Sequence, residues 1–328
     1  MNVTLNEEIK VEEADSVEIL SLVDNSVDFL SAVSNPQVQS FRRWKRERHD
    51  KEWGKTHMDL PFAEHGFSVL IRVFSGDKSR CVLFDVGGTI RGMVENAERM
   101  AISLSGVESI VLSHGHYDHF GGLATAVKAI NKPDLPIIIH ENMFKTRGST
   151  NAKGKVRQYP DFPSEEELSP ARLVSTKQPS LTADGMVCVT GEIPRITSFE
   201  TGYTQHKVFV KGAWKSDPLI MDERAVAIDV KGKGLVVVSG CAHAGIINTV
   251  DYAQQITGTK KVYAVLGGFH LAGKTFENRI QPTIEELQRI NPELIVPSHC
   301  TGWKAMCAMA KTFPEAFVWN SVGNLYKI

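Results

Sequence analysis

The chain has 328 residues, of which 42% are hydrophobic and 23% charged, and its formal net charge is -1. This composition is typical of a folded globular protein, and the near-zero charge argues against a polyanionic partner such as nucleic acid. No apolar run reaches the roughly 18 residues of a membrane span, and the N-terminus lacks a secretory signal. The five cysteines have no paired spacing. We therefore expect a soluble cytoplasmic protein without membrane contact or a disulfide framework.

Short runs rich in valine, isoleucine and leucine predict strands that are buried on both faces of a sheet. Helical spacing of apolar residues predicts helices between many of these runs. Strands that alternate with helices indicate an α/β protein. The predicted strands lie at 16–24, 66–74, 80–88, 108–116, 135–141, 186–191, 224–230, 234–241, 261–268, 293–300 and 316–321, and the predicted helices at 92–104, 121–130, 246–256, 283–290 and 304–313.

The stretch from about 40 to 65 is the most polar in the chain. It has five basic residues between Arg42 and Arg48, with Trp44 and Trp53 interleaved. Such a segment could hold phosphate groups, or it could be a solvated excursion or a contact between subunits. We favour the second interpretation, and a homodimer is then a reasonable expectation.

The chemistry is predicted to lie where the strand near 108–113 ends. His114, His116, Asp118 and His119 follow within six residues. In an extended segment alternate side chains share a face, so the first three can project together, and a helix from about 121 would turn His119 toward the same cavity. Asp118 alone could cap a helix and a lone histidine is usually structural. Four such residues together predict a metal site, and their ligand types suit zinc, iron or manganese.

The region from about 144 to 222 is rich in proline, serine and lysine and has little helical periodicity. We interpret it as an insertion that could fold over the site as a lid. His206 lies in this polar region. It is expected at the surface, as are His49 and His57 earlier in the chain.

The His-x-His-x-Asp-His run after a buried strand resembles the hallmark of the metallo-β-lactamase superfamily. The resemblance extends from about Phe67 to the C-terminus and includes the segments LFDVGG, VVVSGCAHAGI and LIVPSHCTG. It implies a single domain with an αββα four-layer sandwich and metals at one edge. It also implies a first metal held by His114, His116 and His243, a second held by Asp118, His119 and His299, and a supporting role for Asp85 behind the metal loop.

The sequence departs from this pattern at one position. Many members carry a Gly-Asp pair whose aspartate bridges the two metals, whereas here the strand leads into Cys241. Cys241 is either a thiolate ligand or an inert buried cysteine, and we favour the inert interpretation. We therefore expect one or two divalent ions, with zinc first and manganese or iron as alternatives.

The segments HGHYDHFGGL, GCAHAGIIN, GGFHL and PSHCTG together resemble the subgroup that contains the dihydropterin-methyl ribofuranosylaminobenzene phosphate synthases of methanopterin biosynthesis. His270, in GGFHL, is expected to contact substrate or donate a proton, with metal binding or structural packing as alternatives. His65 and His140 flank predicted strands and could line the cavity, as hydrogen-bond partners or as substrate contacts.

The resemblance implies a metal-dependent hydrolase that uses an activated water on an ester, amide or phosphodiester of a small molecule. Asp118 would orient the water and His270 would protonate the leaving group. A pterin-related synthase with the same ligands, acting on a phosphorylated or pterin-like substrate, is the alternative. Non-catalytic metal binding and RNA processing are further alternatives, and the near-zero charge disfavours RNA.

Overall fold

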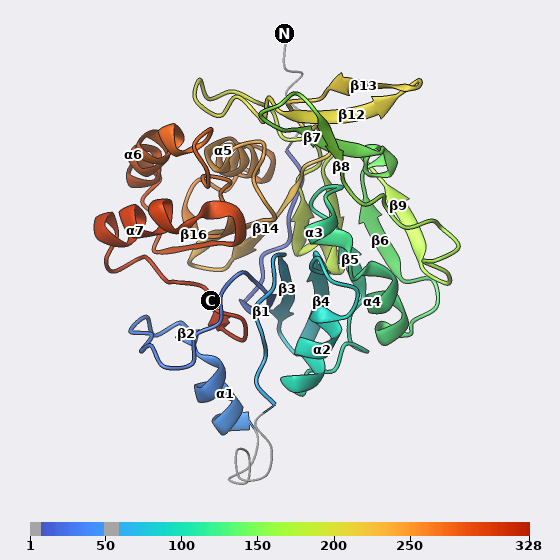
Figure 1. Ribbon diagram of the computed structural model, residues 1–328. Helices are drawn as coiled ribbons and strands as arrows, with labels where there is room; N and C mark the ends of the chain where they lie inside the picture. Colours follow the sequence, from blue (N-terminus) through green and yellow to red (C-terminus); the bar gives the residue numbers. More distant parts are fainter. Residues whose placement is uncertain (1–7, 49–58) are drawn as a thin grey trace.

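A computed structural model describes residues 8–48 and 59–328 of the chain (Figure 1). The first sheet of this structure has eight strands in the order β2-β18-β1-β3-β4-β5-β6-β9. Strands β4, β5, β6 and β9 run parallel, whereas β1, β3 and β4 are antiparallel neighbours. The bounds are β1 Ser16–Val23, β2 Val38–Gln39, β3 Ser68–Ser75, β4 Lys78–Phe84, β5 Ser109–Val111, β6 Pro136–Ile139, β9 Arg172–Ser175 and β18 Leu325–Lys327.

The second sheet has six strands in the order β10-β11-β14-β15-β16-β17. Strands β15, β16 and β17 are parallel, so their carboxyl ends meet at one edge. The bounds are β10 Ser180–Thr182, β11 Val187–Val189, β14 Ala225–Val230, β15 Gly234–Ser239, β16 Val262–Gly268 and β17 Leu294–Ser298.

Helices cover the outer faces of both sheets, with α2 and α4 on one side and α5, α6 and α7 on the other (Figure 1). Both faces of the first sheet are apolar, and β3 is an example: Val69 and Ile71 pack between the two sheets, while Leu70 packs toward α2 and α4. A third apolar layer lies between the second sheet and its helices. The predicted αββα sandwich is therefore confirmed. The helices are α2 Gly92–Arg99, α3 Tyr117–Phe120, α4 Leu123–Ile130, α5 Ile246–Thr257, α6 Ile280–Ile290 and α7 Trp303–Thr312.

Some boundaries differ from the prediction. Helix α2 ends at Arg99 instead of continuing to 104, because Ala101 takes a left-handed backbone with φ of 54°. The predicted strand at 316–321 is wrong, since this stretch makes only an isolated bridge from Phe317 to Ile295. None of the helices in the described ranges is both long and apolar enough to cross a bilayer.

The region 144–222 contributes to all three sheets of the molecule. Its strand β9 extends the first sheet, and β10 and β11 extend the second. The other four strands form a third sheet in the order β13-β12-β7-β8, seen at the top of Figure 1. Their bounds are β7 Arg147–Thr150, β8 Val156–Gln158, β12 His206–Val210 and β13 Ala213–Ser216.

The basic run near the N-terminus forms helix α1, Phe41–Arg48. Three of its side chains are buried: Phe41, Trp44 and Lys45. Trp44 donates its Nε1 hydrogen to the carbonyl of Gly323, and Lys45 donates to the carbonyl of Met100 at 2.9 Å. This half of the run therefore packs against the body of the protein. Trp53, His49 and His57 lie outside the described residues.

Candidate metal centre

The six predicted ligands come together at the edge where strands of both main sheets end. His114 and His116 follow β5, and Asp118 and His119 lie on α3. The remaining two, His243 and His299, follow β15 and β17 of the second sheet. Asp118 is presented by a helical turn and not by the extended alternation that we expected.

The first three histidines form one group. The Nδ1 atom of His116 lies 2.9 Å from Nε2 of His114 and 3.2 Å from Nε2 of His243. All three rings are buried. Burial, together with neighbouring histidines, holds the pKa of each ring well below 6.5, so the rings are neutral bases.

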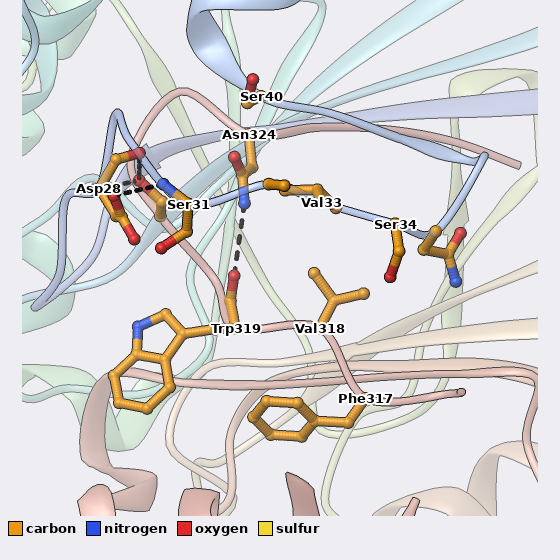
Figure 2. Close-up of a pocket in the computed structure, with 12 residues that line it drawn as sticks. Asp28, Ser31, Val33, Ser34, Ser40, Phe317, Val318, Trp319 and Asn324 are labelled. Carbon is orange, nitrogen blue, oxygen red and sulfur yellow. Dashed lines mark hydrogen bonds between the residues drawn. The ribbon is translucent and has the colours of Figure 1, made fainter. Parts of the chain in front are cut away.

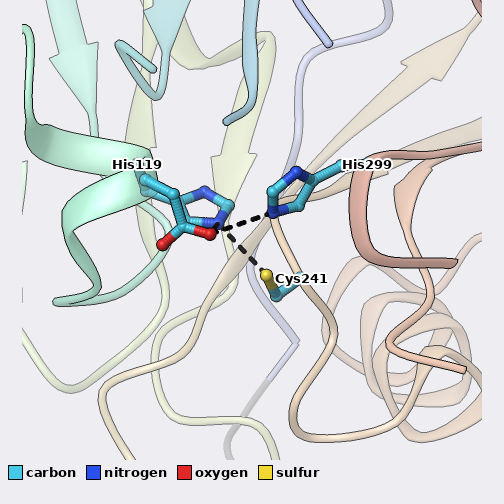
Figure 3. A group of neighbouring side chains, drawn as sticks. His119, Cys241 and His299 are labelled. Atoms are coloured by element: carbon cyan, nitrogen blue, oxygen red, sulfur yellow. Dashed lines mark hydrogen bonds and ion pairs between the residues drawn. The ribbon is translucent and has the colours of Figure 1, made fainter. Parts of the chain in front are cut away.

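The second group contains Asp118, His119 and His299, and Cys241 joins them (Figure 3). Nε2 of His119 lies 3.1 Å from the sulfur of Cys241, and Nε2 of His299 lies 3.3 Å from Oδ2 of Asp118. Burial raises the pKa of the Asp118 carboxyl, but the neighbouring histidines outweigh it and hold that pKa well below its usual value. Burial lowers the pKa of His119, yet Asp85 and Asp118 outweigh it and raise that pKa to about 9.

Hydrogen bonds behind the rings determine which nitrogen carries the proton. Nδ1 of His119 donates to Oδ2 of Asp85 at 2.6 Å. Nδ1 of His299 donates to Oδ1 of Asn25 at 3.0 Å, because the amide nitrogen of Asn25 is used on the carbonyl of His299. Nε2 of each ring therefore faces the centre, where it can bind a metal once it carries no proton.

His114 is oriented in the same way. Its Nδ1 lies 2.9 Å from Oγ of Ser113, whose own hydrogen goes to Oδ2 of Asp85 at 2.7 Å. The hydroxyl oxygen can then only accept, so Nδ1 of His114 donates and Nε2 is a lone pair. Asp85 thus contacts the ring of His119 directly and that of His114 through Ser113.

His206 is buried, and its predicted place at the surface is wrong. Its Nδ1 donates to the carbonyl of Asp217 at 2.8 Å, which leaves Nε2 as an acceptor 3.1 Å from Nε2 of His116. His116 must donate there, so its Nδ1 is the lone pair that faces His114. Strand β12 carries His206 to this position through pairing with β7, and a polar local sequence gave no signal of that pairing.

The centre fits a divalent metal by its donor set. The lone pairs of His114 Nε2 and His116 Nδ1 face each other at 2.9 Å without a hydrogen between them, an arrangement that repels unless a cation lies between them. Imidazole, carboxylate and thiolate together are ligands that suit zinc. Histidines that bind a metal through one ring nitrogen typically form a hydrogen bond through the other, as do the rings of His114, His116, His119 and His299.

Close packing supports the loop that carries the first ligands. A Cβ atom added at Gly115 would lie 2.9 Å from Cα of Met143, so glycine is required for this approach. The amide of Gly115 donates to Oδ2 of Asp222 at 2.8 Å. This loop is therefore held by the segment that precedes β14.

A pocket of about 230 Å³ opens over the centre. Aromatic side chains form much of its wall, and the guanidinium of Arg157 lies 5.4 Å above the ring of Tyr159. This wall is built partly by β8 of the third sheet. The pocket is lined by His65, His116, Tyr117, Asp118, Arg157, Tyr159, Tyr203, Cys241, His243, His270, Ala272, Phe276 and Cys300.

Three further predicted histidines have different places. His65 lines the pocket with Nε2 3.3 Å from Oδ2 of Asp118, and this contact raises the pKa of His65. His270 also lines the pocket, with its ring centroid 4.1 Å from that of His243. His140 does not reach it, because Nε2 binds Glu192 at 2.8 Å and Nδ1 accepts the amide of Asn142.

A second cavity of about 320 Å³ lies between residues 28–40 and 317–324 (Figure 2). Its walls combine Trp319 and Phe317 with serine hydroxyls. The carboxylate of Asp28 accepts the amides of Leu30 and Ser31. Among the described residues no histidine or cysteine lines this cavity, so its walls lack the imidazole and thiol groups that gather at the metal centre.

Comparison with known proteins gives consistent results. The model of the metallo-β-lactamase superfamily matches residues 62–197. A 7,8-dihydropterin-6-methyl-4-(β-D-ribofuranosyl)-aminobenzene-5′-phosphate synthase of Methanocaldococcus jannaschii is 34% identical over 272 residues, which are 81% of this chain and 91% of the relative. An uncharacterised protein of the same archaeon is 31% identical over 81% of this chain and 94% of its own. The crystal structure of Tm1679, a metal-dependent hydrolase of the β-lactamase superfamily, shares the fold with a TM-score of 0.69 at 23% identity, over 95% of this chain and 98% of its own.

Proposed function

Since the chain belongs to the metallo-β-lactamase superfamily, as its histidine motif predicted, we propose that it is a metal-dependent hydrolase of small molecules. The observation that supports this most is the convergence of neutral imidazole lone pairs and the Asp118 carboxylate beneath an open pocket. A structural zinc site is closed by protein ligands, whereas a catalytic site keeps a position for water or substrate. The pocket over these groups favours the catalytic class.

The proposed ligands are His114, His116 and His243 for one ion and Asp118, His119 and His299 for the other. Zinc bound there would lower the pKa of a water molecule from about 15.7 to roughly 7 and would polarise the bond to be broken. Asp118 also accepts a hydrogen bond from His65 at 3.3 Å. It is therefore placed to orient a water molecule at the pocket floor.

The pocket walls indicate the kind of substrate. Tyr117, Tyr159, Tyr203 and Phe276 offer ring faces and edges to a flat aromatic group. Among the described residues Arg157 is the one arginine or lysine on the wall, and it suits an anionic group such as a phosphate. His270 lies beside His243 on the same wall, at a position open to substrate contact or to metal binding.

A synthase that acts on a pterin-like substrate is the second candidate. It is supported by the 34% identity to a protein named as a dihydropterin ribofuranosylaminobenzene phosphate synthase and by the aromatic walls with their single arginine. In this reaction the same donors would hold the metal, and the pocket would hold two substrates instead of one substrate and water.

Elemental analysis and substrate screening test the proposal together. Protein loaded with zinc, manganese or iron is assayed on aryl phosphodiesters, esters and lactones, and separately on a dihydropterin with an aminobenzene ribofuranosyl phosphate. We expect about two metal ions per chain, with about one in the double variant Asp118→Ala/His119→Ala. His140→Gln is the matched control, because His140 is a buried histidine away from the pocket. Failure of every metal to bind would refute the proposal, and turnover of the pterin pair alone would favour the synthase.

A further inference from the structure

A third group of potential ligands lies on the pocket side of the centre. Suitable donor atoms of Cys241, His270 and Cys300 all lie within 4.8 Å of one another. These residues follow β15, β16 and β17, three adjacent parallel strands, so the fold brings their side chains to one edge. The group shares Cys241 with the two groups described above, but His270 and Cys300 belong to neither.

The backbone at this edge leaves space for two sulfur-bearing side chains. A Cβ atom added at Gly268 would lie 2.7 Å from the sulfur of Cys300 and 3.1 Å from Cα of Cys241. The cysteines are consequently packed against a glycine on the strand between them. Cys241 is buried, while Cys300 is partly exposed and lines the pocket.

His270 completes the group at an energetic cost. Its φ of 44° lies in the left-handed region, which is unfavourable for a residue with a side chain. Both ring nitrogens are buried without an oxygen or nitrogen partner among the described residues. A strained backbone that holds an unpartnered imidazole beside two thiols is costly for a merely structural residue, whereas a bound cation would satisfy the ring.

We propose that Cys241, His270 and Cys300 form a thiolate-rich site that binds a soft divalent ion such as zinc, cobalt or cadmium; this inference deepens the proposed function and rests on it. Binding releases one proton from each thiol, so that two thiolates and a neutral imidazole balance the charge of the ion. All three residues line the pocket, so an ion held by them would lie at the pocket wall. Thiolate ligands favour these ions over magnesium and manganese, so this group would bind zinc, cobalt or cadmium in preference to them.

Cobalt substitution tests the site by spectroscopy, without an activity assay. Chelator-treated, reduced protein is titrated with Co²⁺ under anaerobic conditions, and the sulfur-to-cobalt charge-transfer band in the near ultraviolet is measured. We expect Cys300→Ser to lose about half of the band and Cys241→Ser to lose at least as much. Cys307→Ser, which changes an exposed cysteine on α7, should leave the band unchanged.

A wild-type band in Cys300→Ser would overturn the inference, because Cys300 would then not bind the metal. Cobalt that binds without any charge-transfer band would also overturn it while leaving the proposed function intact. Failure of cobalt and zinc to bind at all would instead refute the proposed function. If a variant does not fold, the test is the rate of alkylation of Cys300 in the wild-type protein. Zinc should protect this thiol and leave Cys307 reactive. Equal reactivity of Cys300 with and without zinc would overturn the inference.

Discussion

Asp222 and Glu223 are adjacent in the sequence, yet each accepts a hydrogen bond from a different ligand loop. Oδ2 of Asp222 accepts the amide of Gly115, next to His114, at 2.8 Å, and Oε2 of Glu223 accepts the amide of Ala244, next to His243. Both carboxylates are buried. One short segment before β14 therefore sets the spacing between the first ligands from one sheet and the ligand from the other.

Replacing Asp222 should destabilise the protein in a pH-dependent manner. Burial raises the pKa of Asp222, but Arg147, at 2.9 Å, and the Gly115 amide outweigh it and lower that pKa from 3.8 to about 2. The stabilisation is therefore present above pH 4 and is lost as the pH falls toward 2, which corresponds to roughly 2 kcal/mol. Asp222→Asn also leaves Arg147 buried without its partner, so a loss of about 3 kcal/mol or more is expected at pH 7.

Urea unfolding at pH 7 and pH 3.5 measures this effect. The difference between wild type and Asp222→Asn should narrow at the lower pH. Asp184→Asn, at an exposed ion pair with Arg80, should change the unfolding free energy little at either pH. An equal loss of unfolding free energy in Asp222→Asn and Asp184→Asn at pH 7 would contradict the assigned role of Asp222.

Removal of His206 should weaken metal binding although it is not a proposed ligand. His206→Ala takes away the acceptor that orients His116 at 3.1 Å, and such losses typically reduce metal affinity by about 10- to 100-fold. Competition with a chelating dye measures the zinc affinity. His140→Ala, another buried histidine, should bind zinc as the wild type does. Wild-type affinity in His206→Ala would show that the contact is incidental.

Asp85→Asn should reduce metal occupancy while it preserves the shape of the side chain. The carboxylate accepts from the Ser113 amide, the Ser113 hydroxyl and His119, and an amide places donors where only acceptors fit. Asp85 has a φ of 55°, as does Asp184, so Asp184→Asn controls for the backbone. Elemental analysis should find less metal in Asp85→Asn and an unchanged amount in the control. Equal metal contents would exclude a supporting role for Asp85.

Zinc should raise the melting temperature of chelator-treated protein. At a free zinc concentration about 1,000 times the Kd, a ligand of the folded state adds about 4 kcal/mol to the unfolding free energy. For a chain of 328 residues this corresponds to a shift of roughly 6 °C. Scanning calorimetry with and without zinc measures the shift. The double variant Asp118→Ala/His119→Ala should show a smaller one, and identical melting temperatures would contradict specific binding by the folded protein.

Much of the fold could be predicted because its signals are local. Continuous apolar runs such as 234–238 predicted strands buried on both faces, and the layered core confirms them. The third sheet could not be predicted, since its short strands are partly exposed and pair residues that are distant in sequence, such as His206 with Ser149. A strand of this kind has no apolar alternation that a window of residues would reveal.

The sequence by itself determined which side chains could bind a metal. His114, His116, Asp118 and His119 are close in the chain, so any compact path keeps them close in space. Only the tertiary structure decided that Cys241 lies 3.1 Å from His119, that His206 stands behind His116, and that Cys300 faces both Cys241 and His270. The first two contacts join elements of different sheets, and the third joins the ends of three adjacent strands of the second sheet. Their distances depend on how the sheets pack and which strands are neighbours, and neither is encoded in the spacing of nearby residues.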